Sequence, residues 1–145
     1  MKAKTKETIA YLKQPQRLDI LIKNKLIERQ QLKDIAMSIT AHSDGERVQS
    51  SGSQQKMADA VGRWIDMDAE INILIDRLID CKREIIADIE QLNTTEYDVL
   101  HKLYIQGLTF DEVAVEQNRS KSWVTTVHGR ALTNVQKIID KKESK

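Results

Sequence analysis

The stretch TFDEVAVEQNRSKSWVTTVHGR, residues 109–130, decides the fold of the last third of the chain. It contains two signals for the start of a helix. Thr109 lies three residues before Glu112, which is the spacing of a capping box, and Ser120 precedes a second run with apolar residues at helical spacing. Between these signals, Asn118 is a residue type that tolerates the left-handed backbone conformation. The stretch therefore predicts two helices joined by a tight turn.

The apolar residues of this stretch have the spacing of a helix-turn-helix. Ala114 is small at the position where the two helices would cross, and the turn residue Asn118 follows four positions later. Val124 and Val127 would then face the first helix. In proteins with this motif, the N-terminal part of the second helix enters the major groove of DNA.

A DNA-binding surface is expected on the residues around these two valines. Serine and threonine are short enough to let a helix approach base edges, and lysine and arginine neutralise phosphates. The predicted DNA-binding residues are Arg119, Ser120, Lys121, Ser122, Trp123, Thr125, Thr126, His128 and Arg130. The last 27 residues, 119–145, hold seven basic and two acidic side chains, which agrees with a polyanionic partner.

The residues before this stretch complete a predicted domain of three helices, residues 92–145. Asn93-Thr94-Thr95-Glu96 resembles a capping box, and a helix with Val99 and Leu103 on its apolar face follows. Gly107 is a natural helix stop. The helix that begins after Ser120 is expected to run to about Asp140.

Residues 1–91 have the pattern of a long antiparallel helical hairpin. A short helix is expected over residues 5–13, and Pro15 suits the first turn of a new helix that continues to about residue 40. A loop rich in serine and glycine follows at about residues 42–53. A heptad pattern then runs over residues 54–91.

The seam of that heptad pattern alternates steps of four and three residues. Its members are Met57, Val61, Trp64, Asp68, Ile71, Ile75, Leu78, Lys82, Ile85, Ile89 and Leu92. The seam fits two arrangements equally, the internal core of a hairpin and an interface between copies of the chain. Because two helices leave much of their apolar surface uncovered, we expect a homo-oligomer.

Other features of the sequence argue against catalysis and against a membrane protein. No phosphate-binding loop or nucleophile motif is present, and His42, His101 and His128 lack metal-ligand spacing. We therefore expect no enzyme, no metal and no cofactor. The single cysteine, Cys81, cannot form an internal disulfide, and no apolar run has signal or membrane-spanning character. A cytoplasmic location is expected, and the resemblance described next implies that this is the cytoplasm of a bacterial host cell.

Residues 92–139 resemble region 4 of bacterial sigma factors, which reads the upstream promoter element. The matching residues are Leu92, Glu96, Val99, Leu100, Tyr104, Gly107, Leu108, Thr109, Phe110, Glu112, Val113, Ala114, Ser120, Lys121, Ser122, Val124, Val127, Arg130, Ala131 and Leu132. One departure is that Gln117 and Arg119 are polar where the turns of sigma factors have apolar residues. The whole chain is similar to the small late-gene transcription activators of phages of Gram-positive bacteria (RinA- and ArpU-like proteins) in size, domain order and the linker at residues 48–53.

These resemblances imply a transcription regulator that binds double-stranded DNA and activates late genes of a phage or prophage together with host RNA polymerase. The acidic first part of the C-terminal domain is poorly suited to lie on phosphates, so Asp111 and Glu116 are the predicted polymerase contact. Two alternatives stay open. One is a small terminase-like DNA-packaging protein, and the other is a helical adaptor that binds only protein.

Overall fold

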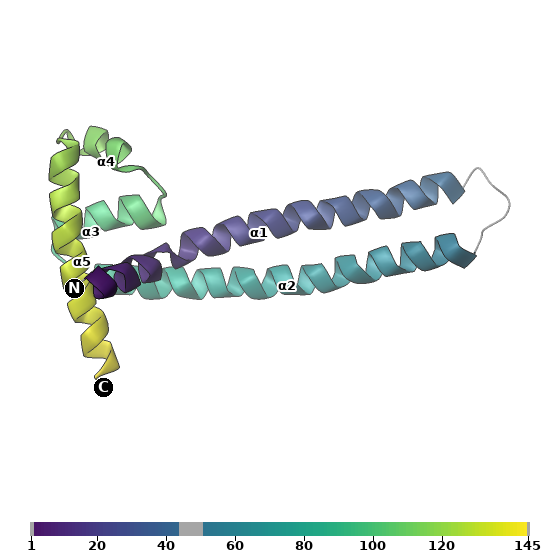
Figure 1. Cartoon of the computed structure of the whole chain (residues 1–145), viewed down its shortest axis with the longest axis horizontal. Helices are drawn as coiled ribbons and strands as arrows, with labels where there is room; N and C mark the ends of the chain where they lie inside the picture. The colour runs from purple at the N-terminus through teal and green to yellow at the C-terminus, as the bar shows by residue number, and fades with distance from the viewer. Residues whose placement is uncertain (1, 44–50, 145) are drawn as a thin grey trace. The chain divides into compact units, whose positions relative to one another are not determined.

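The part of the chain described by the computed structural model, residues 2–43 and 51–144, folds into helices and turns without a β-strand (Figure 1). The elements are α1 (Lys2–Ser43), α2 (Ser51–Ile89), α3 (Thr94–Leu100), a π-helical turn η1 (His101–Ile105), α4 (Phe110–Gln117) and α5 (Lys121–Glu143). The all-α class expected from the sequence is confirmed. The expected loop at residues 42–53 lies partly outside the described residues, and those of its residues that are described belong to α1 and α2. No helix within the described ranges is long and apolar enough to cross a membrane.

The chain divides into two compact units. The terminal unit comprises Met1–Arg17 and Leu78–Lys145, and the middle unit comprises Leu18–Arg77. The sequence placed a boundary near residue 91, whereas the first turns of α1 and the last turns of α2 group with the C-terminal helices.

Complete burial of side chains on these helix ends explains their place in the terminal unit. Leu12, Ile85 and Ile89 are inaccessible to solvent. Burying a large aliphatic side chain stabilises a fold by about 1.5–3 kcal/mol. The expected helix start at Pro15 is wrong, because α1 continues through the proline. The Pro15 side chain is fully buried, and packing there offsets the missing backbone hydrogen bond.

In the middle unit, α1 and α2 lie side by side as an antiparallel pair (Figure 1). The Lys25 ammonium is 3.0 Å from the Glu70 carboxylate, and the Arg29 guanidinium is 2.8 Å from Asp68. Since the partner's number falls as the residue number on α1 rises, the helices run in opposite directions. The predicted pair of long packed helices is confirmed.

The buried seam of α2 differs from the predicted seam at alternate positions. Ile71 and Ile85 are buried as expected, but Leu74 is buried where Ile75 was expected, and Ile75 is 38% exposed. The predicted seam would have buried the charges of Asp68 and Lys82, which is costly without full pairing. A shift by one residue instead buries Leu74 and Cys81 and leaves Asp68 at the edge, where it meets Arg29.

The helices of the terminal unit start and stop where the sequence signals lie. Thr109 and Glu112 form a complete capping box, Gly107 has a φ of 77°, and Asn118 takes the left-handed conformation with a φ of 54°. The cap at Asn93 forms only one of the two hydrogen bonds of a capping box. Its side chain accepts from the backbone N–H of Glu96, but the Glu96 carboxylate accepts from the side-chain amides of Asn93 and Asn134, both at 2.6 Å.

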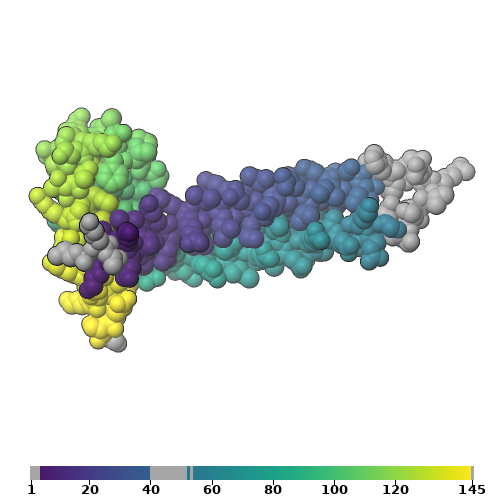
Figure 2. All heavy atoms as spheres, viewed as in Figure 1, coloured from purple at the N-terminus to yellow at the C-terminus, as the bar shows by residue number. Residues whose placement is uncertain are grey.

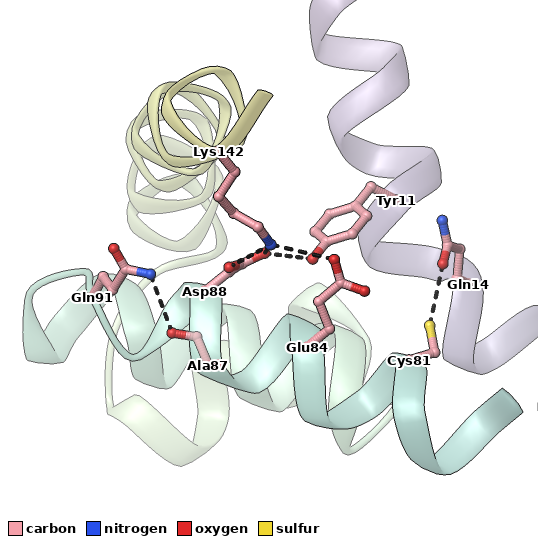
Figure 3. Close-up of polar contacts among 8 residues, drawn as sticks. All are labelled: Tyr11, Gln14, Cys81, Glu84, Ala87, Asp88, Gln91 and Lys142. Atoms are coloured by element: carbon pink, nitrogen blue, oxygen red, sulfur yellow. Dashed lines mark hydrogen bonds and ion pairs between the residues drawn. The ribbon is translucent and has the colours of Figure 1, made fainter. Parts of the chain in front are cut away.

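A buried carboxylate fixes the C-terminal half of α5 within the terminal unit (Figure 3). Asp88 of α2 is 3% exposed, and the Lys142 ammonium lies 3.0 Å from each of its oxygens. The Tyr11 hydroxyl donates to the same carboxylate, and burial followed by the hydrogen bond and charge of Asp88 raises the pKa of Tyr11. Nearby, the Thr8 hydroxyl bonds to Gln136. Side chains from α1, α2 and α5 therefore meet at one point, which is named the Asp88 cluster below (Tyr11, Asp88 and Lys142).

Candidate nucleic-acid interface

The N-terminal half of α5 has one buried face and one exposed face. Val124 and Ala131 are inaccessible to solvent, and Val127 is 5% exposed, so these residues face the unit's core. The exposed face carries small hydroxyl side chains and basic side chains. It is named the outward face of α5 and consists of Lys121, Ser122, Thr125, Thr126, Gly129, Arg130 and Thr133.

The hydroxyl groups of the outward face are held in defined positions. Thr125 donates to the backbone carbonyl of Lys121 and Thr126 to that of Ser122, each at 3.0 Å. With their protons used, the two threonine oxygens are left as acceptors beside exposed methyl groups. That combination can accept hydrogen bonds from the amino groups of cytosine or adenine and can contact the thymine methyl. Ser120, also predicted as a DNA contact, is the N-cap of α5 and accepts from the Trp123 N–H at 3.0 Å.

The two polar residues of the turn have partners of their own. Gln117 donates to Asp98 of α3, a carboxylate that also receives the Lys102 ammonium at 2.6 Å. Burial alone would raise the pKa of Asp98, but the bonds from Lys102 and Gln117 outweigh it and lower that pKa. Arg119 stays exposed and lies with its guanidinium carbon 5.3 Å from the centre of the half-buried Trp123 ring. Gln117 is thus held by Asp98 of α3, and Arg119 lies over the Trp123 ring.

His128 was predicted as a DNA contact, but its side chain is engaged inside the unit. It lies one turn after the buried Val124, and its Nε2 is 2.7 Å from the Tyr104 hydroxyl. The Phe110 ring meets it edge-on, with centroids 5.0 Å apart. Burial, followed by the positive charge of Lys13, lowers the pKa of His128. The His128 ring therefore packs against Tyr104 and Phe110 and is not part of the outward face.

Gly129 is a feature of the outward face that the sequence reading missed. A methyl group added at its Cα would meet no other atom of the chain, so packing does not require a glycine there. Glycine inside a helix costs about 0.5–1 kcal/mol relative to alanine. Close approach of another molecule to this side of the helix would explain such a residue. The signal in the sequence was a glycine in the interior of a helical pattern.

The predicted polymerase contact and the predicted DNA contact touch one another. The Lys121 ammonium is 3.6 Å from Asp111, and both side chains are well exposed. Glu116 is exposed on α4 beside Val115, whose side chain is 78% exposed. These two residues border a shallow, largely apolar hollow together with Leu108 and Asp111.

The described residues hold no cluster of three side chains able to bind a metal ion. The chain matches no protein-family model, no curated protein and no solved structure. The resemblances noted from the sequence therefore stay predictions, and the function has to be argued from the geometry.

Proposed function

We propose that the protein is a sequence-specific regulator of transcription that binds double-stranded DNA through the N-terminal half of α5. The single observation that carries this proposal is the outward face, which combines exposed lysine and arginine with short hydroxyl side chains and a glycine on a helix whose other face is fully buried. Such a surface can enter the major groove without steric obstruction. The left-handed turn at Asn118 and the buried Ala114 support a helix-turn-helix geometry for α4 and α5.

The roles of the contact residues follow from their chemistry. Lys121 and Arg130 neutralise phosphates and contribute affinity that falls as salt rises. Thr125 and Thr126 meet base edges and determine which sequence is preferred. Ser122 contacts either a base or the backbone, and Arg119, held over Trp123, reaches a phosphate beside the turn.

Selection of bound fragments from phage genomic DNA tests the proposal. We expect the full chain to enrich a discrete sequence, and the enriched fragments to map to a promoter of late genes. Thr125→Ala or Thr126→Ala should change the enriched sequence more than the overall affinity. Enrichment of a packaging site instead would favour the terminase-like alternative. No binding to any fragment at low salt would contradict DNA binding and favour the adaptor.

Host RNA polymerase is the proposed second partner, and the exposed side of α4 is the proposed contact. On this side of α4, the exposed Val115 lies beside the acidic Glu116. Such a pair fits a partner surface that carries basic side chains and an exposed apolar side chain. Asp111 is less suited to a clean test, because it pairs with Lys121. We expect Val115→Ser with Glu116→Lys to reduce transcription from the target promoter while the DNA footprint stays intact. Unchanged transcription would exclude this side of α4.

Self-association through the middle unit would pair two DNA-binding helices. Several large apolar side chains are more than half exposed there, namely Ile20, Ile27, Ile35, Met37, Ile65 and Ile73. Ile20, Ile27 and Ile35 are spaced by seven and eight residues and so follow one side of α1. A continuous apolar stripe of this kind favours an interaction site, and pairing raises the effective concentration of the second DNA-binding helix at an adjacent half-site. We expect the full chain to sediment as an oligomer and the variant Ile20→Ser, Ile27→Ser, Ile65→Ser to shift toward monomer. A parent chain that sediments as a folded monomer at high concentration would contradict self-association.

A further inference from the structure

The first turns of α1 lie beside the C-terminal half of α5 in the terminal unit (Figures 1 and 2). The Thr8 hydroxyl bonds to Gln136, and the Lys4 ammonium is 4.0 Å from Asp140. Figure 2 shows the two segments in contact at the surface, where the start of the chain (purple) meets its end (yellow). Lys4 is thus brought next to the helix that carries the outward face.

A hollow of about 190 Å³ opens between these two segments. Its α1 side is formed by Lys4, Thr5 and Thr8, and its α5 side includes Thr133 and Lys137. Asp140 is the acidic residue of the hollow, and Lys4 and Gln136 both lie within reach of its carboxylate. Lys137 is exposed and forms no ion pair with another described residue, and the Lys4 side chain stays 66% exposed beside Asp140.

The hollow continues the outward face of α5. Thr126, Arg130, Thr133 and Lys137 follow one another at steps of four, three and four residues, so they lie along one side of the helix. Lys137 is twelve residues from Thr125, which corresponds to about 18 Å along the axis. The major groove is about 12 Å wide. If the N-terminal part of α5 enters the groove at an angle, as recognition helices do, this end of the helix emerges beside the phosphates that border the groove.

We propose that the hollow between α1 and α5 receives a phosphate of the DNA backbone, bound by Lys4 from the first turns of α1 and by Lys137 from α5. The inference rests on the proposed function and adds to it that the DNA interface is built from both ends of the chain. The α5 outward face reads the groove, and α1 contributes contacts that are independent of sequence and depend on salt.

Salt-dependent binding of the full chain to its selected DNA site tests this inference. The variants are Lys4→Ala, Lys137→Ala and the two combined, and the matched control is Lys56→Ala with Arg63→Ala, which removes two exposed charges from α2 in the middle unit. Each single variant should lower the slope of log affinity against log salt by about one, and the double variant by about two. Between 50 and 200 mM salt, the ratio of the parent's DNA affinity to that of the double variant should fall about tenfold. The control should keep the parental slope.

Two further measurements separate a DNA contact from a structural role and from failure of the proposed function. Exposed lysine to alanine changes in a helix should leave the thermal unfolding curve in place, and ethylation interference should show that Lys4→Ala abolishes the effect of one phosphate flanking the groove. A parental slope for Lys4→Ala, beside a lowered slope for Lys121→Ala, would overturn the role of α1 and leave DNA binding by α5 intact. A parent that selects no DNA site would overturn the proposed function itself and this inference with it.

Discussion

The two halves of α5 use their side chains in opposite ways. In the C-terminal half, Val135 is inaccessible to solvent, Gln136 bonds to Thr8, and Lys142 is held by the buried Asp88. In the N-terminal half, the outward face leaves hydroxyl and basic groups exposed. One helix therefore carries both a structural segment and a surface available to a ligand. Apart from the proposed phosphate contact of Lys137, substitutions in the two halves of α5 should therefore change stability and the proposed DNA binding separately.

The largest expected effect is on stability, at the Asp88 cluster. Asp88→Ala removes the acceptor of both Lys142 and Tyr11, so the Tyr11 hydroxyl loses its partner and Lys142 keeps only the exposed Glu84. We expect the free energy of unfolding, measured with a denaturant, to fall by about 2–4 kcal/mol. Glu84→Ala is the control, since this exposed carboxylate also meets Lys142, at 3.2 Å, and should cost less than about 1 kcal/mol. Equal losses for the two variants would contradict a special role for the buried carboxylate.

The turn that leads into the N-terminal half should be the next most sensitive position. A β-branched residue at Asn118 would be strained at a φ of 54°. Asn118→Val should lower the free energy of unfolding by about 1–3 kcal/mol, whereas Asn118→Gly should change it little. Chemical denaturation of both variants checks this prediction. If valine is tolerated as well as glycine, the left-handed turn does not constrain α4 and α5.

Two substitutions of Gly129 should separate stability from DNA binding. Alanine should raise the stability, and leucine should weaken binding. Gly129→Ala meets no neighbouring atom and should raise the free energy of unfolding by about 0.5–1 kcal/mol. If DNA approaches this side of α5 closely, Gly129→Leu should fold normally and bind its site at least tenfold more weakly, as measured by titration at fixed salt. Unimpaired binding by the leucine variant would place the DNA elsewhere.

The smallest expected effect is a pH dependence from His128. Its pKa in the folded chain lies below the usual 6.5, chiefly because of burial, so the unfolded chain takes up a proton first as the pH falls. The stability that neutral His128 contributes is therefore complete above pH 6.5 and is lost as the pH falls from 6.5 through the folded-state pKa. Unfolding at pH 7.5 and 5.5 should show a smaller loss for His128→Gln than for the parent. The same loss in both chains would mean that another group causes the pH dependence.

Local signals in the sequence were sufficient to predict much of the fold. The capping box at Thr109, the stop at Gly107 and the left-handed Asn118 depend on residues within a few positions of one another, and the structure has each of them. The same local reasoning placed Val124 and Val127 inside and the small polar residues of α5 outside. Helix periodicity fixes such faces because each residue advances by 100°.

Contacts between distant segments were beyond that reasoning. The seam of α2 was predicted one residue away at alternate positions, since two neighbouring faces both carry apolar residues and only the partner helix decides between them. Pairing of Asp88 with Lys142 joins residues 54 positions apart, and that of Thr8 with Gln136 joins residues 128 positions apart. His128 was predicted as a DNA contact because it lies close in sequence to the other predicted contacts. In the structure, contacts with Tyr104 and Phe110 determine where its ring lies.

The proposed binding of DNA by the N-terminal half of α5 is tested most directly with one quadruple variant. Lys121, Thr125, Thr126 and Arg130, all exposed, are replaced together by alanine in the full chain. The control replaces Asn24, Gln31, Lys56 and Arg63, exposed residues of the middle unit that carry the same total charge. Both variants should unfold at the parental temperature, and only the α5 variant should lose binding to the selected site, by at least a hundredfold at low salt. A folded α5 variant that binds the site as tightly as the parent would show that DNA does not bind through this face of α5.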